Sequence, residues 1–354
     1  MSFERSKEVL DKTASYNVKD VELIIYHDGK EVFREKRNSS RNDDNGLVNI
    51  YSCSKVITCS AALRLYEEGK LSLDDPVSKY IPAFGDIKVK KNGGIYRAEK
   101  EMKVWHLFNM CGGFDYREHA PEIVRGIEET EGRCPTLKMM DYYAQVPLNF
   151  EPGESWCYSL CHDVIPAIIE VITGKKFGCY VKETIFDPLG MDTATFLLPK
   201  EKLDLVIPQY RPLSEYEYND VGPENVCYQI GTEFESGGAG CVCRPIDYIK
   251  FLEGMRTEKV ISYETIELMS KNLLDEAKLA LCTSPKGYGY GLGVRAPLPE
   301  SGRTDIGWGG AAGAYPVLDI KNGLSAYYSQ HTLGRTVCDR NAMVDAIMLD
   351  LGLK

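Results

Sequence analysis

The chain has 354 residues, which is enough for one large domain or for a domain with a subdomain. Its composition, with 44% hydrophobic and 27% charged residues, is that of an ordinary globular protein and excludes the disordered, collagen-like and coiled-coil classes. The formal net charge of -10 repels phosphate backbones and anionic lipid surfaces, so we expect no nucleic acid partner and no membrane association.

The first residues, 1–8, lack an apolar run of signal-peptide length, and no later segment approaches the roughly eighteen apolar residues of a membrane span. These features predict a cytoplasmic protein in which the twelve cysteines are free thiols. The close pairs Cys241-x-Cys243 and Cys157-x3-Cys161 have no matching partner pairs, which favours buried thiols over a metal site. We therefore expect neither a metal nor an organic cofactor.

The N-terminal part of the chain predicts a helix, a hairpin and a second helix. Residues 3–14 have an amphipathic helical pattern, and 21–26 and 31–33 are typical of two strands joined by an Asp-Gly turn. From 53 to 68 the hydrophobic periodicity is helical, and it ends at Gly69, which suits the left-handed conformation found after a helix.

The middle of the chain, from Asp74-Asp75-Pro76 onward, consists of short helices and loops rich in proline and glycine, with a helix over 163–172. A glycine cluster at 236–240 precedes a helix near 245–256. The rest of the chain predicts strands and one last helix, at 288–295, 305–310, 314–320, 324–330 and, for the helix, 338–350.

Strands at both ends of the sequence predict an α+β fold. Its antiparallel sheet is built from N- and C-terminal segments and flanked by helices, and a mostly helical subdomain is inserted. We place the sheet body at residues 1–75 and 235–354 and the inserted subdomain at 76–234. The glycine-rich run 287–293 lacks the spacing of a nucleotide loop, so we interpret it as a closely packed strand.

Ser52-x-x-Lys55 stands at the start of the second predicted helix. A separation of three on a helix puts the two side chains on one face and within reach of each other. A serine hydroxyl needs a base to become a nucleophile, and burial at the positive end of a helix disfavours the ammonium form of lysine. The pair is a candidate nucleophile and proton acceptor, although the spacing alone is common.

Two further segments offer partners for this pair. Tyr158 precedes the helix predicted at 163–172, where its phenol can complete a hydrogen-bonded set with serine and lysine; the alternative is a packed core tyrosine. The segment Trp308-Gly309-Gly310-Ala311 puts small residues on a predicted strand. A substrate can lie along such a backbone, and an N–H there can bind an oxyanion.

The order of these motifs resembles that of the serine β-lactamase/penicillin-binding-protein-like superfamily, in particular its esterase branch related to class C β-lactamases (family VIII carboxylesterase-like). The resemblance runs from Tyr26-His27-Asp28-Gly29 to the Trp-Gly-Gly segment and includes the connecting segments 63–77, 105–113, 185–191 and 236–240. Together these segments are far more specific than any one motif.

The resemblance implies a β-lactamase/transpeptidase-like fold and a two-step acyl transfer. Ser52 would be the acylated nucleophile, Lys55 its proton partner and Tyr158 the general acid and base. The backbone N–H groups of Ser52 and Ala311 would form the oxyanion hole, which can supply several kcal/mol of stabilisation. The residues lining the substrate beside them would be Trp308, Gly309 and Gly310.

Two positions depart from the β-lactamase pattern. Leu160 stands where those enzymes have an asparagine, and Trp308 where they have a lysine or histidine. A β-lactam or D-Ala-D-Ala peptide carries a carboxylate that needs a cation, whereas Trp308 offers an apolar wall. Esterases of the superfamily share both departures, which favours a neutral ester with a modest acyl group. Arg303 or Arg244 on a loop keeps the β-lactam alternative open.

A Ser-His-Asp arrangement is the other common hydrolase design. His162 lies four residues after Tyr158 and beside Asp163, so it is either catalytic or a helix residue that supports the site. The sequence around Ser52 contains no G-x-S-x-G elbow, which argues against an α/β-hydrolase.

We therefore hypothesise a serine esterase that acts on a small carboxylic ester through an acyl-Ser52 intermediate. Water, a small alcohol or an amine can be the acceptor, so an acyltransferase is an alternative, as is a β-lactamase or D-amino-acid peptidase with the same mechanism. The rival from another class is a non-catalytic binding or assembly-forming relative. The presence of Ser52, Lys55 and Tyr158 together disfavours that rival, because a scaffold has no physical need for all three.

Overall fold

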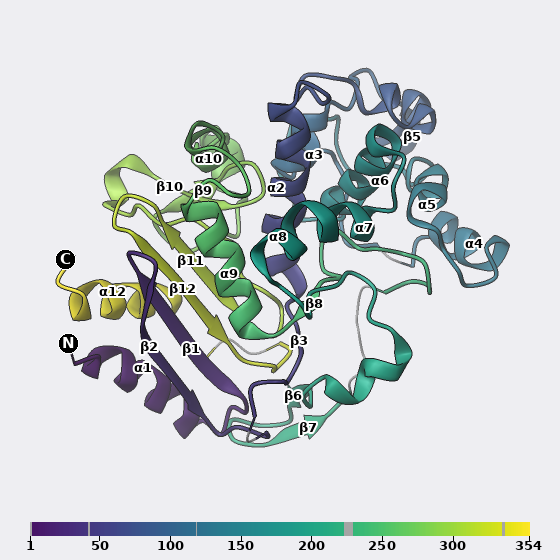
Figure 1. Cartoon of the computed structure of the whole chain (residues 1–354). Coiled ribbons are helices and arrows are strands. Elements are labelled where there is room, and N and C mark those ends of the chain that lie inside the picture. Colours follow the sequence, from purple (N-terminus) through teal and green to yellow (C-terminus); the bar gives the residue numbers. More distant parts are fainter. Residues whose placement is uncertain (1, 42, 118, 223–228, 335–336) are drawn as a thin grey trace.

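The computed structural model places a four-stranded sheet and a helical body side by side (Figure 1). It describes residues 2–41, 43–117, 119–222, 229–334 and 337–354. No helix within these ranges is both long enough and apolar enough to cross a membrane.

The sheet has four antiparallel strands in the order β11-β12-β1-β2. β1 and β2 form the predicted hairpin, and β12 pairs with β1 so that Ile25 lies opposite Ala326. The predicted sheet built from both ends of the chain is therefore confirmed. The bounds are Val21–His27 for β1, Lys30–Arg37 for β2, Tyr315–Asp319 for β11 and Leu324–Ser329 for β12.

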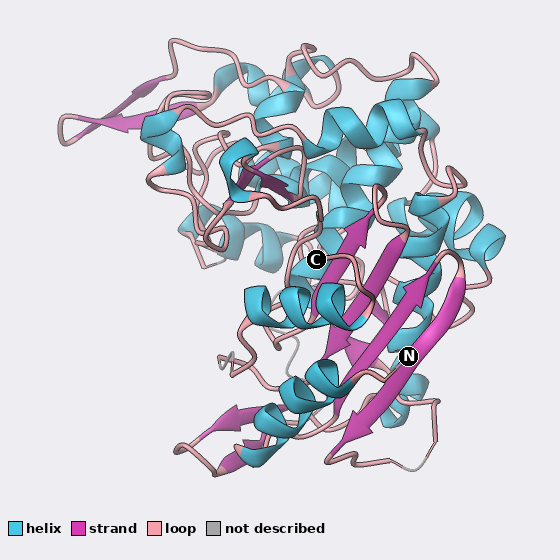
Figure 2. Ribbon diagram, turned by 90° about the vertical axis from the view of Figure 1, so that its left-hand side faces the viewer, coloured by secondary structure: helices cyan, strands magenta, loops and turns pink. Residues whose placement is uncertain are grey.

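Helices cover both faces of this sheet. α1 (Glu4–Ser15) and α12 (Arg340–Asp350) pack on one face, as Figure 2 shows, and α9 (Pro245–Arg256) crosses the other. Leu23 and Ile25 of β1 pack with the first two helices, whereas Ile24 belongs to the larger core on the opposite face. Because both faces are buried, the strand is a continuous apolar run rather than an alternating one.

The helical body lies beside the sheet, with α2 (Ser54–Glu67) between the two (Figure 1). Most of α2 is buried on all sides, which matches its lack of a polar face. The domain boundaries at 76 and 234 stay a prediction. The other helices of the body are α3 (Val104–Phe108), α4 (Pro121–Glu129), α5 (Thr136–Tyr143), α6 (Cys161–Thr173), α7 (Phe177–Val181) and α8 (Asp187–Leu189).

Several short elements complete the fold. A hairpin that the sequence analysis missed has an Asn92-Gly93 turn, in which both residues adopt positive φ angles of 51° and 77°. The short elements are β3 (Val48–Asn49), β4 (Lys88–Lys91), β5 (Gly94–Arg97), β6 (Tyr210–Pro212), β7 (Tyr218–Asp220), β8 (Val242–Cys243), α10 (Tyr263–Ser270) and α11 (Glu276–Leu279).

Two of the predicted strands were wrong in their extent. The segment 288–295 forms two short strands, β9 (Tyr288–Tyr290) and β10 (Arg295–Pro297), because Gly293 turns between them at φ +86°. The segment 305–310 makes only isolated bridges, from Ile306 to Leu318 and from Gly307 to Arg295. The close packing predicted for the glycine-rich run is confirmed: a Cβ on Gly293 would lie 2.4 Å from the sulfur of Cys59.

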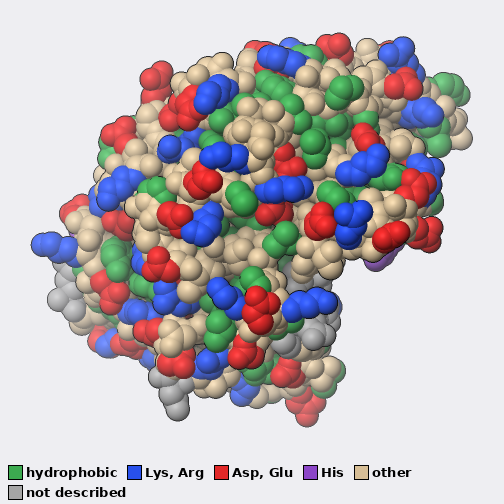
Figure 3. All heavy atoms as spheres, turned by 45° about the vertical axis from the view of Figure 1, so that its right-hand side comes forward, with side chains coloured by type: hydrophobic (Ala, Val, Ile, Leu, Met, Phe, Trp, Pro, Cys, Tyr) green, Lys and Arg blue, Asp and Glu red, His purple; other side chains and the backbone are tan. Residues whose placement is uncertain are grey.

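The surface mixes charges of both signs. On the face in Figure 3, lysine and arginine side chains are interspersed with aspartate and glutamate, without a broad basic region. This distribution matches the net charge of -10 and offers no stripe for a phosphate backbone on that face.

Candidate active site

Ser52 lies in a tight turn, Tyr51–Cys53, that leads directly into α2. The preceding residue, Tyr51, has φ +47°, a left-handed conformation that is strained for a side chain of this size. Tyr51 is fully buried, and its phenol donates a hydrogen bond to Gln209. The surrounding core therefore holds the turn that presents the Ser52 hydroxyl to a pocket of about 230 Å³.

Lys55 is fully buried in the first turn of α2, one helical turn after Ser52. Its Nζ donates to three acceptors: Ser52 Oγ at 3.2 Å, Tyr116 Oη at 3.0 Å and the Gly238 carbonyl at 2.7 Å. An ammonium group has three donors, so this set satisfies it completely. The amine is in position to exchange a proton with the serine hydroxyl.

Tyr158 lines the same pocket as Ser52. Its ring centre lies 4.8 Å from Lys55 Nζ, and its Oη accepts a 2.7 Å hydrogen bond from Trp308 Nε1. The nucleophile, amine and phenol proposed from the sequence thus lie together, although they come from the start of α2 and the approach to α6. Trp308 joins them through an indole N–H that the sequence analysis did not consider.

The segment Trp308–Ala311 forms one wall of the pocket without being a strand. The Gly310 N–H donates to the Ala314 carbonyl at 2.8 Å, which closes a turn before β11 begins. A Cβ on Gly310 would lie 2.4 Å from the Ile50 carbonyl. Glycine therefore lets this wall approach the backbone just before Ser52, which brings Ala311 into the same pocket.

The cations near the site are not the ones considered from the sequence. Arg303 is bound to Asp345 and Arg244 to Asp247, and neither lines this pocket. Arg295 and Arg340 line it instead.

Arg295 is fully buried and paired with Asp305, yet its Nε and Nη1 have no hydrogen-bond partner among the described residues, and Arg340 Nε also lacks one there. Both guanidinium groups lie over the ring of Tyr315, at 4.1 and 5.1 Å. Their convergence on the pocket depends on tertiary packing, and no spacing in the sequence indicates it.

His162 lies in the first turn of α6, outside the residues that line the pocket. Its Nε2–H donates to the Phe108 carbonyl at 3.0 Å, and its ring contacts the Cys59 sulfur. Burial, reinforced by the charge of Lys55, lowers the pKa of His162 to about 3. A neutral imidazole packed beneath the site favours the supporting role over the catalytic one.

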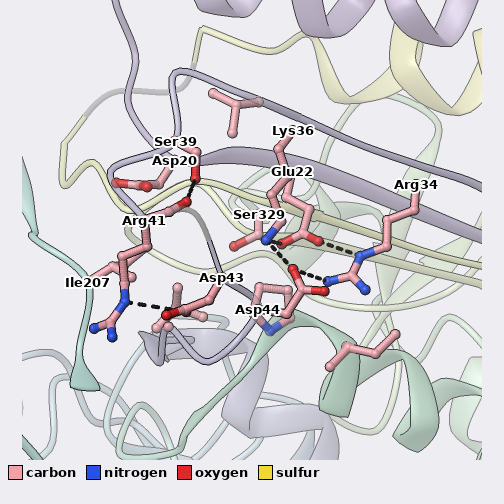
Figure 4. A pocket seen from close by; sticks show the side chains of 15 residues that line it. Asp20, Glu22, Arg34, Lys36, Ser39, Arg41, Asp43, Asp44, Ile207 and Ser329 are labelled. Atoms are coloured by element: carbon pink, nitrogen blue, oxygen red, sulfur yellow. Dashed lines mark hydrogen bonds and ion pairs between the residues drawn. The ribbon is translucent and has the colours of Figure 1, made fainter.

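A second group of charged residues lines a small pocket at one end of β1 and β2 (Figure 4). Arg34 and Lys36 pair there with Glu22 and Asp44, so these charges largely neutralise one another. The pocket contains no buried serine and lysine pair of the kind found at Ser52, and we regard it as structural.

A family model described as Beta-lactamase matches residues 7–345. The chain belongs to the β-lactamase family. The resemblance stated from the motifs is thereby confirmed, and the family places the chain among the serine hydrolases.

Two curated relatives of this β-lactamase family member differ in activity. Esterase EstB of Burkholderia gladioli is 26% identical over 339 residues, covering 84% of this chain and 80% of the relative. A putative D-alanyl-D-alanine carboxypeptidase of Escherichia coli K12 is 29% identical over 192 residues, covering 50% of this chain and 43% of the relative.

A solved structure described as EstCE1, a hydrolase with promiscuous acyltransferase activity, superposes with a TM-score of 0.80 at 22% identity and covers 97% of both chains. At this identity the likeness concerns the fold, and it confirms the predicted β-lactamase/transpeptidase-like architecture. The family thus includes esterase, acyltransferase and peptidase relatives.

Proposed function

We propose that the protein is a serine esterase that cleaves a small carboxylic ester through an acyl-Ser52 intermediate. The observation that carries this proposal is the 3.2 Å hydrogen bond from Lys55 Nζ to Ser52 Oγ beside a pocket that also holds Tyr158. A buried amine next to a hydroxyl is the arrangement that turns serine into a nucleophile.

In the first step the Ser52 oxygen attacks the ester carbonyl, and its proton passes to the Lys55–Tyr158 pair. The negative charge that develops on the carbonyl oxygen is bound by the backbone N–H groups of Ser52 and Ala311. Tyr158 then returns a proton to the departing alkoxide, which leaves as an alcohol.

In the second step an acceptor attacks the acyl-Ser52 ester. Tyr158 removes a proton from the acceptor, and Ser52 regains its own proton as the acyl group departs. Water as acceptor gives a carboxylic acid, whereas a small alcohol gives a new ester by the same chemistry. This symmetry agrees with the acyltransferase activity described for EstCE1.

A neutral ester suits the wall of the pocket. Trp308 presents an indole at the position where a cation would bind a substrate carboxylate. The similarity to esterase EstB, which extends over 84% of this chain, also supports an ester substrate. Tyr158 and Tyr290 enclose the Trp308 ring at centroid distances of 5.3 and 4.8 Å, so the wall is rigid and largely apolar. Such a surface favours a modest acyl group.

A fluorophosphonate probe followed by mass spectrometry tests the proposal. We expect the label on Ser52, and we expect Ser52→Ala to lose it together with about a thousandfold or more of the esterase activity. Ser54→Ala is the matched control, because the Ser54 hydroxyl is fully buried and accepts a hydrogen bond from the Cys241 N–H. A folded wild-type protein without label would contradict the enzyme proposal and favour the non-catalytic relative.

A second candidate is a β-lactamase or D-amino-acid peptidase with the same nucleophile. It is favoured by Arg295 and Arg340, two cations that line the pocket beside Ser52, because a substrate carboxylate needs a cation. If this candidate is correct, a chromogenic cephalosporin is hydrolysed faster than a short-chain nitrophenyl ester.

Arg340→Gln should then lower the ratio of the two kcat/KM values by about tenfold. An unchanged ratio, or a wild-type preference for the neutral ester, leaves the esterase as the function.

A further inference from the structure

Asp163 is a buried carboxylate that the mechanism above does not use. It is the third residue of α6 and is only 3% exposed. Its Oδ1 accepts hydrogen bonds from Ser236 Oγ at 2.5 Å and from the Gly238 N–H at 3.2 Å. Within the described residues it has no ion-pair partner at contact distance. A carboxylate held this way in the interior calls for an explanation, because burying an unpaired charge is costly.

The loop 236–238 connects this carboxylate to Lys55. Gly238 directs its N–H toward Asp163 and its carbonyl toward Lys55 Nζ, 2.7 Å away. The Gly237 carbonyl accepts from Thr58 Oγ1 at 2.8 Å, which ties the same loop to α2. A Cβ on Gly238 would lie 2.7 Å from Asp163 Oδ2, so the loop fits against the carboxylate only without a side chain.

The charges of Asp163 and Lys55 also act on each other directly. Lys55 is fully buried, and its acceptors are two hydroxyls and a carbonyl, so no carboxylate of the described residues touches its ammonium group. Burial raises the pKa of the Asp163 carboxyl, and the Lys55 charge and the hydrogen bonds from Ser236 and Gly238 oppose that rise. The neighbouring His162 is neutral, since its pKa is lowered to about 3, which leaves Lys55 as the cation that faces the carboxylate.

We propose that Asp163 is a positioning residue: it fixes the Gly238 carbonyl that aims Lys55 at Ser52, and its negative charge balances the Lys55 ammonium inside the fold. This inference rests on the proposed esterase mechanism. Through Asp163, α6 contributes to the proton-transfer site from a position outside the pocket.

Asp163→Asn removes the charge while its amide oxygen can still accept both hydrogen bonds. Removing a negative charge beside a proton-transfer site makes the loss of a proton from that site easier. The acid limb of the pH profile of kcat/KM, and of the rate of fluorophosphonate labelling, therefore moves to lower pH by about one unit. KM at the pH optimum should stay within about twofold, because Asp163 does not touch the substrate.

Asp247→Asn is the matched control. Asp247 is also fully buried, but it is bound to Lys250 on α9 and to Arg244 just before that helix, so its variant should lose stability without moving the profile. If Asp163→Asn does not fold, Ser236→Ala takes its place. Losing one donor makes the Asp163 carboxylate less ionised, so the profile should move in the same direction by a smaller amount.

The outcomes separate the two proposals. A labelled wild-type protein whose pH profile is unmoved in Asp163→Asn, or in Ser236→Ala if that variant replaces it, overturns the role of Asp163 and leaves the esterase intact. A wild-type protein that is never labelled at Ser52 overturns the proposed function itself.

Discussion

The hydrogen bond from Trp308 Nε1 to Tyr158 Oη gives the indole a second role besides forming a wall of the pocket. The ring is the apolar wall expected from the sequence, and its N–H also donates to the phenol that is proposed to shuttle protons. A donor aimed at an oxygen stabilises the oxygen when it is negative, because charge-assisted hydrogen bonds are stronger than neutral ones. Trp308 thereby gives the phenol a hydrogen-bond donor without adding a charge to the pocket.

Trp308→Phe removes this donor and keeps an aromatic ring. We expect kcat/KM at pH 7 to fall about tenfold, since the phenol loses its hydrogen-bond donor. The rate of nitrophenyl ester hydrolysis measures the effect. Trp156→Phe is the control, because the Trp156 ring stacks on Tyr158 while its Nε1 has no hydrogen-bond partner in the part of the chain that the structure describes. Equal effects of the two substitutions would show that ring size, not the N–H, matters.

The residues that sequence reasoning found and missed differ in a physical way. Ser52 and Lys55 were predicted to meet because a separation of three on a helix brings side chains together whatever the rest of the fold does. Tyr116 lies 61 positions from Lys55 and reaches it only through packing of the helical body, so no local pattern indicates the contact. Arg340 enters the pocket from the last helix for the same reason. The catalytic roles themselves stay predictions.

The fit between helix α6 and the loop 236–238 depends on a proline within the helix. Pro166 has no N–H, so the His162 carbonyl one turn earlier lacks its helical hydrogen bond. Gly237 packs on this carbonyl: a Cβ there would lie 2.5 Å from His162 O and 2.6 Å from Pro166 Cγ. The loop can therefore approach α6 closely enough for Asp163 to reach Ser236 and Gly238.

Gly237→Ala should force the loop away from α6. We expect the free energy of unfolding to drop by about 2 kcal/mol, as in other overpacked cores, and labelling of Ser52 to slow at least tenfold. Urea unfolding and the labelling rate measure the two effects. Gly85→Ala is the control, because a Cβ at Gly85 meets only Ser78 Cβ at 3.7 Å. Wild-type labelling in Gly237→Ala would mean that the loop tolerates the shift.

Elements with strong periodicity were predicted well, and those made by long-range contacts were not. The helix predicted at 245–256 coincides with α9, and Gly69 and Gly174 end helices in the left-handed conformation. The segment 305–310 has strand-like composition, yet it meets partners only at Ile306 and Gly307 before Gly310 folds back on Ala314. Whether such a segment forms a strand depends on neighbours distant in the sequence.

Three buried histidines link the stability of the whole molecule to pH. Burial lowers the pKa of His106 and His331 to about 4 and that of His162 to about 3. The unfolded chain binds protons at these positions near pH 6.5, well before the folded chain does. Their contribution to stability is therefore complete above pH 6.5 and is lost as the pH falls toward 4.

His331 offers the clearest test of this linkage, since its Nε2 accepts from the Asn49 N–H and its Nδ1–H donates to the Ile207 carbonyl, away from the site. His331→Gln should be less stable than the wild type at pH 7.5. The difference should shrink by up to ~1.4 kcal/mol per pH unit below pH 6.5, because only the wild type loses this contribution. Urea unfolding at pH 7.5, 6.0 and 5.0 measures it. A difference that is constant across this range would contradict the expectation.

The pairing of β1 with β12 has a consequence for the synthesis of the chain. The two strands are separated by about 300 residues, so β1 has no partner on that edge until those residues have been translated. Ser52 and Lys55 emerge long before the wall at Trp308–Ala311. Until β12 has been made, the chain exposes an apolar strand edge and is vulnerable to association with other nascent chains. During the same period the pocket is not assembled, so the chain is not yet active.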